Sequence, residues 1–283
     1  VLVATVLLAV TIGSADLGVG EVWRSVAWHL TRGLGVDHVV GVEPLSVLRD
    51  GVVWQLRLPR VLTAAAVGAG LALCGVVMQS LTRNPLADPY LLGLSSGASL
   101  GAVLVLVLGL GVLLPVAAFA GAVLALAVAL GLAGALGAIT PTRTVLSGLA
   151  VSQLCAAATS FVIFWSATGD SYREILSWLM GSVAGATWGS VAIAGIAVVV
   201  LGAALALSGS ALDAFTFGDS SAAALGISVE RTRWVLLVGV ALLTGALVSV
   251  SGAVGFVGLI LPHAVRLLPG ARHRLLLPLS ALT

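Results

Sequence analysis

The chain has 283 residues, of which 60% are hydrophobic and only 8% are charged. Soluble domains carry about 25% charged residues, so this composition leaves too little polar surface for a soluble globule. Lipid must be the solvent for most of the surface, which excludes an ordinary cytoplasmic enzyme. All 13 basic side chains are arginine, and a P-loop needs a lysine on its phosphates. The chain therefore has no P-loop of its own, and its net charge of +2 indicates no nucleic-acid surface.

Long apolar runs separated by polar breaks predict membrane-spanning helices, each of about 20 residues. The run Pro89–Thr142 is long enough for two spans divided near Leu110–Pro115, and Trp234–Val265 predicts two spans broken at Ser251–Gly255. The last residues begin a further span. The other predicted spans are Val1–Gly13, Val61–Thr82, Val145–Thr168 and Thr187–Leu207. We therefore expect an all-α polytopic bundle with about eight spans and the start of a ninth, since a β-barrel would need alternating segments of about ten residues.

Polar segments separate these runs. A stretch containing tryptophan extends from Asp16 to Gln55, Asp170–Glu174 predicts a polar break, and Ser208–Arg233 predicts a charged loop. The chain starts without methionine and stops inside an apolar run, so we interpret it as a single membrane domain over residues 1–283, truncated at both ends.

Arginine positions predict the orientation of the chain in the membrane. If the first span runs outward from the cytoplasm, most interhelical arginines fall on the cytoplasmic side, in agreement with the positive-inside rule. The short outer loops then carry only Arg173, and the long first outer loop is a weak signal. The arginines predicted to lie inside are Arg83, Arg143, Arg231, Arg233, Arg266, Arg272 and Arg274.

Several short motifs lie at the ends of the predicted spans. Arg57 and Arg60 offer two guanidinium forks for carboxylates, although interfacial anchoring would equally explain them. The segment Arg83–Pro89 has prolines four residues apart, which predicts a non-helical turn. Asp219 can cap a short helix whose end is signalled by Gly226, and such a helix at the membrane surface is either a docking element or a simple connector.

One apparent catalytic motif is rejected. Gly93-Leu94-Ser95-Ser96-Gly97 matches the G-x-S-x-G pattern of hydrolases, but that motif requires a preceding strand within an α/β sheet. Here we expect it to open a membrane helix.

The motifs occur in an order that identifies a family. They are R-L-P-R at 57–60, Gly68, Gly75 and Gln79 within a span, R-N-P-L-A-D-P at 83–89, L-G-L-S-S-G-A at 92–98, W-L-M-G-S at 178–182, Leu225-Gly226, G-F-V-G-L-I-L-P-H at 255–263 and H-R-L-L-L-P at 273–278. Together they resemble the FecCD-like permease subunits of ABC importers for iron siderophores, haem and vitamin B12, over nearly the whole chain. Members of that family have ten spans, so the resemblance implies that one to two spans are missing here.

The resemblance implies a partner set. A permease of this type forms half of a translocation pore with a second permease chain, identical or different, in the bacterial cytoplasmic (inner) membrane. Two separate ATP-binding subunits would supply the energy, and an extracytoplasmic solute-binding protein would deliver the ligand. ATP and Mg²⁺ would then be bound by the ATPase, this chain would hold no cofactor or metal, and it would not be an enzyme.

The resemblance also implies roles for particular residues. Arg57 and Arg60 would meet acidic residues of the binding protein. A cytoplasmic gate would contain Asn84, Leu86, Thr142 and Leu146. The ATPase-coupling segment would contain Phe217, Gly218, Asp219, Ala222, Ala223, Leu225 and Gly226, with Asp219 acting as a helix cap.

The cargo expected from the resemblance is a ferric siderophore, with vitamin B12 or haem as alternatives. An ion-coupled secondary transporter is a more distant alternative, and the predicted spans lack the buried ionisable residues typical of ion or proton relays. A passive channel would not require the coupling loop, and a membrane-embedded enzyme would need a polar catalytic cluster that the sequence lacks.

Overall fold

The computed structural model describes residues 1–13, 15–35, 45–110, 113–135, 137, 139–166, 169–267 and 272–283. These residues form helices and connecting turns, and no strand occurs among them. The helices in the first half of the chain are α1 (Leu2–Thr11), α2 (Val19–Gly33), α4 (Val47–Gly51), η1 (Val52–Arg57), α5 (Leu58–Thr82), η2 (Pro89–Leu92), α6 (Leu94–Val107) and α7 (Leu114–Ala135). Those in the second half are α8 (Pro141–Ser166), α9 (Gly169–Leu179), α10 (Trp188–Ala197), η4 (Val198–Gly202), α11 (Ala203–Ala206), α12 (Gly209–Thr216), α13 (Asp219–Ala224), α14 (Val229–Ser251), α15 (Val257–Arg266) and α16 (His273–Leu282).

Five helical segments in the described part of the chain are long and apolar enough to cross a membrane. They are Val47–Thr82, Leu114–Ala135, Pro141–Ser166, Trp188–Ala206 and Val229–Ser251. The apolar helices α1, α6 and α15 are shorter, at 10 to 17 residues. The all-α membrane architecture is therefore confirmed, whereas the predicted count of eight spans and part of a ninth is not.

Most predicted boundaries agree with the structure, and two polar segments contain more helix than expected. A proline lies in the first turn of α5, where its missing N–H costs nothing, and α8 begins at Pro141, four residues before the predicted span Val145–Thr168. The predicted break at 251–255 separates α14 from α15. The expected polar break at 170–174 lies inside α9, and the expected loop at 208–233 contains α12 and the start of α14 in addition to α13, the short helix predicted before Gly226.

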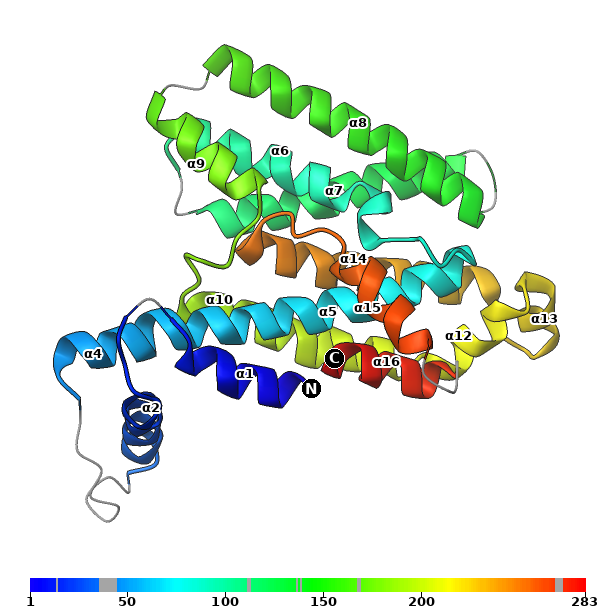
Figure 1. Cartoon of the computed structure of the whole chain (residues 1–283). Helices are drawn as coiled ribbons and strands as arrows, with labels where there is room; N and C mark the ends of the chain where they lie inside the picture. The colour runs from blue at the N-terminus through cyan, green and yellow to red at the C-terminus, as the bar shows by residue number, and fades with distance from the viewer. Residues whose placement is uncertain are drawn as a thin grey trace.

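The helices pack around α5 and α14, which cross the centre of the molecule (Figure 1). The main hydrophobic core joins these two helices to α6, α7, α10, α12 and α16. Close packing replaces the hydrophobic effect in lipid, because the surrounding acyl chains are as apolar as the core. A Cβ on Gly97 of α6 would lie 2.4 Å from the carbonyl oxygen of Gly121 of α7, so only glycine permits this crossing.

The two ends of the bundle differ in charge. The ends of α5 and α15, the start of α8, α12, α13, and the starts of α14 and α16 gather at one end, while α4 and α9 lie at the other (Figure 1). The first group carries Arg83, Arg143, Arg231, Arg233, Arg266, Arg272 and Arg274 at or near these helix ends. We call it the arginine-rich end, and it contains the loops that the sequence predicted to share one side of the membrane.

Candidate functional site

The segment after α5 forms the non-helical turn that its prolines predict. Arg83 ends α5 in a left-handed conformation with φ of 52°. Asn84 accepts a hydrogen bond from the backbone N–H of Leu86 at 3.0 Å through Oδ1, and Asp88 accepts one from Tyr90 N–H at 2.8 Å. These side-chain-to-backbone bonds fix the turn locally and leave the Leu86 side chain exposed.

Leu86 faces α8 and the start of α15 across a cavity. The cavity has a volume of about 350 Å³ and is lined by Leu86, Leu149, Ser152, Phe256 and Tyr90, among others. Tyr90 donates from its hydroxyl to the carbonyl oxygen of Val254 at 2.9 Å, which joins η2 to the break before α15. Thr142 and Leu146 lie exposed on α8, one to two turns before Leu149, and neither lines this cavity. Leu86 thus shares a cavity with Leu149 of α8 and not with the predicted Thr142 and Leu146.

Phe256 is a member of this cavity that sequence reasoning did not select. It is exposed and has φ of 67°, a left-handed conformation that costs a non-glycine residue free energy. The glycines at 252 and 255, which interrupt the apolar run just before it, were the only available signal.

The segment α12–α13 forms two short helices at the arginine-rich end (Figure 1). Gly226 has φ of 83°, its N–H donates to Ala223 O at 2.9 Å, and Ile227 N–H donates to Ala222 O at 3.1 Å. This is the glycine-terminated helix end that Gly226 predicted. Ala222 is buried, whereas Phe217 and Leu225 are 79% and 71% exposed and present apolar surface outward.

The predicted capping role of Asp219 is wrong. Gly218 is the N-cap of α13 and makes no side-chain cap bond, while Asp219 is the first helical residue. Both carboxylate oxygens of Asp219 instead accept from Nη2 of Arg233, at 2.8 and 3.0 Å. Arg233 is buried, and its Nη1 donates to Ile139 O at 2.9 Å. The carboxylate therefore ties α13 to α14 and to the segment before α8.

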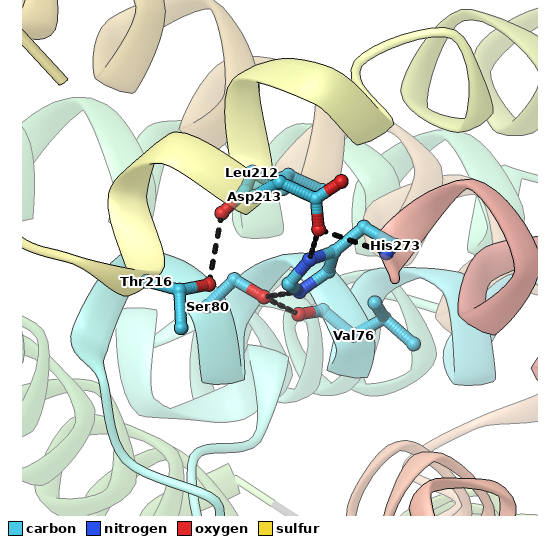
Figure 2. Close-up of polar contacts among 6 residues, drawn as sticks. All are labelled: Val76, Ser80, Leu212, Asp213, Thr216 and His273. Atoms are coloured by element: carbon cyan, nitrogen blue, oxygen red, sulfur yellow. Dashed lines mark hydrogen bonds and ion pairs between the residues drawn. The ribbon is translucent and has the colours of Figure 1, made fainter. Parts of the chain in front are cut away.

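A second polar network fixes α12. Figure 2 shows Ser80 of α5, Asp213 of α12 and His273 of α16 converging on one another. Asp213 Oδ1 lies 2.7 Å from Nδ1 of His273 and accepts from its backbone N–H at 3.0 Å, and Ser80 contacts Nε2. Burial alone would raise the pKa of Asp213, but the hydrogen bonds from His273 and the charges of His273 and Arg272 hold that pKa below its usual range.

This Ser–His–Asp set is structural. A hydrolase nucleophile must be exposed beside an oxyanion hole. Ser80 is buried within α5 and its hydroxyl donates to Val76 O at 2.9 Å, so it is a helix residue that locks α16 and α12 against α5.

The two arginines predicted to dock a binding protein have different environments. Arg57 is only 8% exposed, and its guanidinium donates to the carbonyl oxygens of Thr11 and Ala15 at 3.3 and 2.7 Å. This geometry favours a structural role in holding the end of α1. Arg60 is exposed, and its Nη2 donates to Ala184 O at 2.6 Å. Of the two, Arg60 is the one whose guanidinium reaches the surface.

Comparison with known proteins defines the class to which this fold and these segments belong. The model of the FecCD transport family matches residues 1–283, and the chain belongs to that family. A solved structure described as an inward-facing conformation of a metal-chelate type ABC transporter superposes with a TM-score of 0.82 at 31% identity, covering 99% of this chain and 83% of that chain.

Individual relatives give the class more detail. The cobalamin import system permease BtuC of Halobacterium salinarum is 39% identical over 100% of this chain and 83% of its own length. The Fe(3+)-citrate import system permease YfmD of Bacillus subtilis is 37% identical over 88% of this chain and 78% of its own. The hemin transport system permease HmuU of Yersinia pestis is 36% identical over 98% of this chain and 80% of its own. The chain is thus a multi-pass membrane permease of the ABC importer type and not an enzyme, since ATP hydrolysis resides on a separate chain.

Proposed function

We propose that this chain forms half of a pore that imports a large metal chelate across the bacterial cytoplasmic membrane, driven by ATP hydrolysis on two partner subunits. A second permease chain, identical or different, would complete the pore. ATP and Mg²⁺ would be held by the ATPase, and this chain would hold no cofactor of its own. Family membership and the arrangement of the arginine-rich end both support this proposal.

The observation that carries the proposal is the α12–α13 segment. Asp219 anchors α13 to α14, and Asp213 anchors α12 to His273 of α16, which in turn contacts Ser80 of α5. Phe217 and Leu225 stay exposed. An exposed apolar surface that polar contacts attach to the bundle helices suits a contact that must transmit movement from an ATPase to the pore helices. A passive channel or an ion-coupled transporter would need no such surface.

The gate and the docking surface follow from the same orientation. The arginine-rich end would face the cytoplasm, so Asn84 and Leu86, with Thr142 and Leu146 on α8, would lie at the inner mouth of the pore. Arg60 at the opposite end would meet a carboxylate of the extracytoplasmic binding protein. Such charge-assisted contacts set orientation and association rate as much as affinity.

The cargo is proposed at the level of a metal chelate. Ferric siderophore is the cargo proposed from the sequence, and cobalamin and haem are equally supported. The relatives named for cobalamin, Fe(3+)-citrate and hemin match at 39%, 37% and 36% identity, so identity does not separate them.

The test is ligand-dependent ATP hydrolysis by the reconstituted complex. The full-length permease would be assembled with its ATPase in nanodiscs, and hydrolysis measured with binding protein loaded in turn with a ferric siderophore, cobalamin and haemin. We expect one ligand to stimulate hydrolysis several-fold over the unloaded binding protein. A folded permease that retains no ATPase and moves its ligand under an ion gradient alone would establish the ion-coupled alternative and refute the proposal.

A further inference from the structure

A cavity at the arginine-rich end has a distinctly cationic lining. Its volume is about 340 Å³, and its walls come from α5, the turn after α5, α12, α15 and α16. Arg83, Arg266 and His273 line it together with the polar side chains of Gln79, Ser80 and Thr216. None of these residues lines the cavity around Leu86, so this is a separate feature of the molecule.

Two guanidinium groups in this cavity have no counter-ion in the described part of the chain. Neither Arg83 nor Arg266 forms an ion pair there, and no carboxylate lines the cavity. The nearby carboxylates already have partners, since Asp213 binds His273 and Asp219 binds Arg233. Arg266 is partly buried, which makes an uncompensated charge at that position costly.

The remaining polar groups of the lining leave the arginines as the free donors. The Ser80 hydroxyl donates to Val76 O, the Thr216 hydroxyl donates to Leu212 O at 3.2 Å, and both ring nitrogens of His273 are engaged. The amide of Gln79 donates to Gly258 O and Leu259 O at 3.4 and 3.3 Å. A ligand here would therefore be held by guanidinium forks, whose planar geometry matches the oxygens of phosphate.

From this juxtaposition we propose that the cavity binds a phosphate-class oxyanion, held by the guanidinium groups of Arg83 and Arg266. The cavity lies where apolar helices end, and basic pockets between membrane helices on that side of a bilayer bind anionic headgroups. The phosphate can thus come from a phospholipid headgroup or from free phosphate. A bound anion would join the end of α5 to α15. The site would lie beside the turn between α12 and α13, because a terminal nitrogen of Arg83 lies 3.4 Å from the position of a Cβ on Gly218.

The proposal goes beyond the importer function and does not depend on it, because the test measures binding to the permease alone. The full-length chain would be reconstituted in nanodiscs of phosphatidylcholine, a lipid without net charge. Its melting temperature would be followed by tryptophan fluorescence while sodium chloride is replaced by sodium phosphate at constant ionic strength. We expect a saturable rise of about 3 °C at phosphate concentrations roughly ten times the dissociation constant.

The second arm distinguishes the two sources of phosphate. The detergent-solubilised chain would be mixed with equal amounts of phosphatidylglycerol and phosphatidylcholine, and the retained lipid identified by native mass spectrometry. Selective retention of phosphatidylglycerol assigns the cavity to a headgroup, and a phosphate-dependent shift without lipid retention assigns it to the free ion. The absence of both effects overturns the proposal.

Charge-matched variants test the location. Arg83→Gln with Arg266→Gln should raise the apparent dissociation constant at least tenfold, or abolish lipid retention. Arg231→Gln with Arg274→Gln removes the same two charges from exposed positions at the same end, outside the cavity, and should retain binding. Equal binding by both double variants overturns the assignment. If the cavity variant fails to fold, Arg266→Lys retains the charge without the fork and should still weaken binding measurably.

Discussion

The buried guanidinium group of Arg233 holds the first residue of α13 in place. Arg233 is 4% exposed, contacts both oxygens of Asp219 and the carbonyl of Ile139, and lies 5.5 Å from the ring centroid of Phe215. Its Nε has no hydrogen-bond partner among the described residues. Burying a cation is costly unless it is paired, so Asp219 compensates a charge that the rest of the site satisfies only in part.

Removing the Asp219 charge should therefore destabilise the protein. We expect Asp219→Asn to cost about 2 kcal/mol of unfolding free energy, below the 3–5 kcal/mol typical of fully buried pairs because Asp219 is partly exposed to solvent. The measurement is thermal unfolding in detergent. Glu230→Gln, an exposed carboxylate on the adjacent helix, is the control and should stay within about 0.5 kcal/mol. An Asp219→Asn variant as stable as this control would show that the pair contributes no net stability.

Individual residues also show which features of the candidate site could be predicted from the sequence. Gly226 was recognisable because a helix end depends on local backbone conformation, and Asn84 because its turn is made by neighbours. The partner of Asp219 lies 14 residues away on another helix, so local capping preferences favoured the wrong role. Arg57 contacts Thr11 and Ala15, which lie 46 and 42 residues before it in the chain. The spacing of residues in the sequence does not predict contacts over such separations.

Contact between helices depends on individual glycines. A Cβ on Gly75 of α5 would lie 1.8 Å from the carbonyl oxygen of Gly258 of α15, far inside van der Waals contact with backbone that cannot rotate away. A Cβ on Gly68, two turns earlier on the same helix, would meet nothing within 4 Å. Replacing each of these two glycines by alanine therefore distinguishes the effect of helix packing on stability from the effect of helix propensity.

Gly75→Ala should force α5 and α15 apart. We expect a loss of about 2–3 kcal/mol and a lower melting temperature, since added atoms at a tight contact are destabilising. Gly68→Ala is the matched control and should leave the melting temperature unchanged or raise it slightly, because alanine favours helix. Thermal unfolding of both variants in the same detergent makes the comparison. Equal melting temperatures for the two variants would show that the α5–α15 contact relaxes without cost.

Helix boundaries were predictable where proline or glycine interrupts an apolar run. The prolines at 83–89 and the glycines at 251–255 mark real helix boundaries, because these residues restrict or free the backbone directly. Hydropathy alone did not give the number of spanning helices, since α6 is 14 residues long and α15 is 10. It also did not indicate the π-helical segments η1 and η4, which interrupt otherwise regular helical runs.

The distribution of charge and apolar surface over the whole molecule places the features used in the proposed function at one end of the bundle. The arginine-rich end carries both the α12–α13 segment, with Phe217 and Leu225 exposed, and the turn containing Leu86. The order of short motifs revealed the family, but the cavity joining Leu86 to Leu149 and Phe256 required three segments to meet in space. A cavity of this kind cannot be predicted from the spacing of motifs, because Leu86, Leu149 and Phe256 are more than 60 residues apart in the chain.

The α12–α13 segment should be needed for assembly with the ATPase. Phe217→Ser with Leu225→Ser removes exposed apolar surface, so the fold should be retained while the amount of ATPase that co-purifies with the permease falls at least tenfold. Leu48→Ser changes a similarly exposed leucine on α4, at the opposite end, and should leave co-purification unchanged. Melting temperatures within about 2 °C of the unmodified chain would establish that folding is intact. If the folded double variant still retained ATPase and ligand-stimulated hydrolysis, the coupling surface would lie elsewhere, and the apolar exposure of α12–α13 would need another explanation.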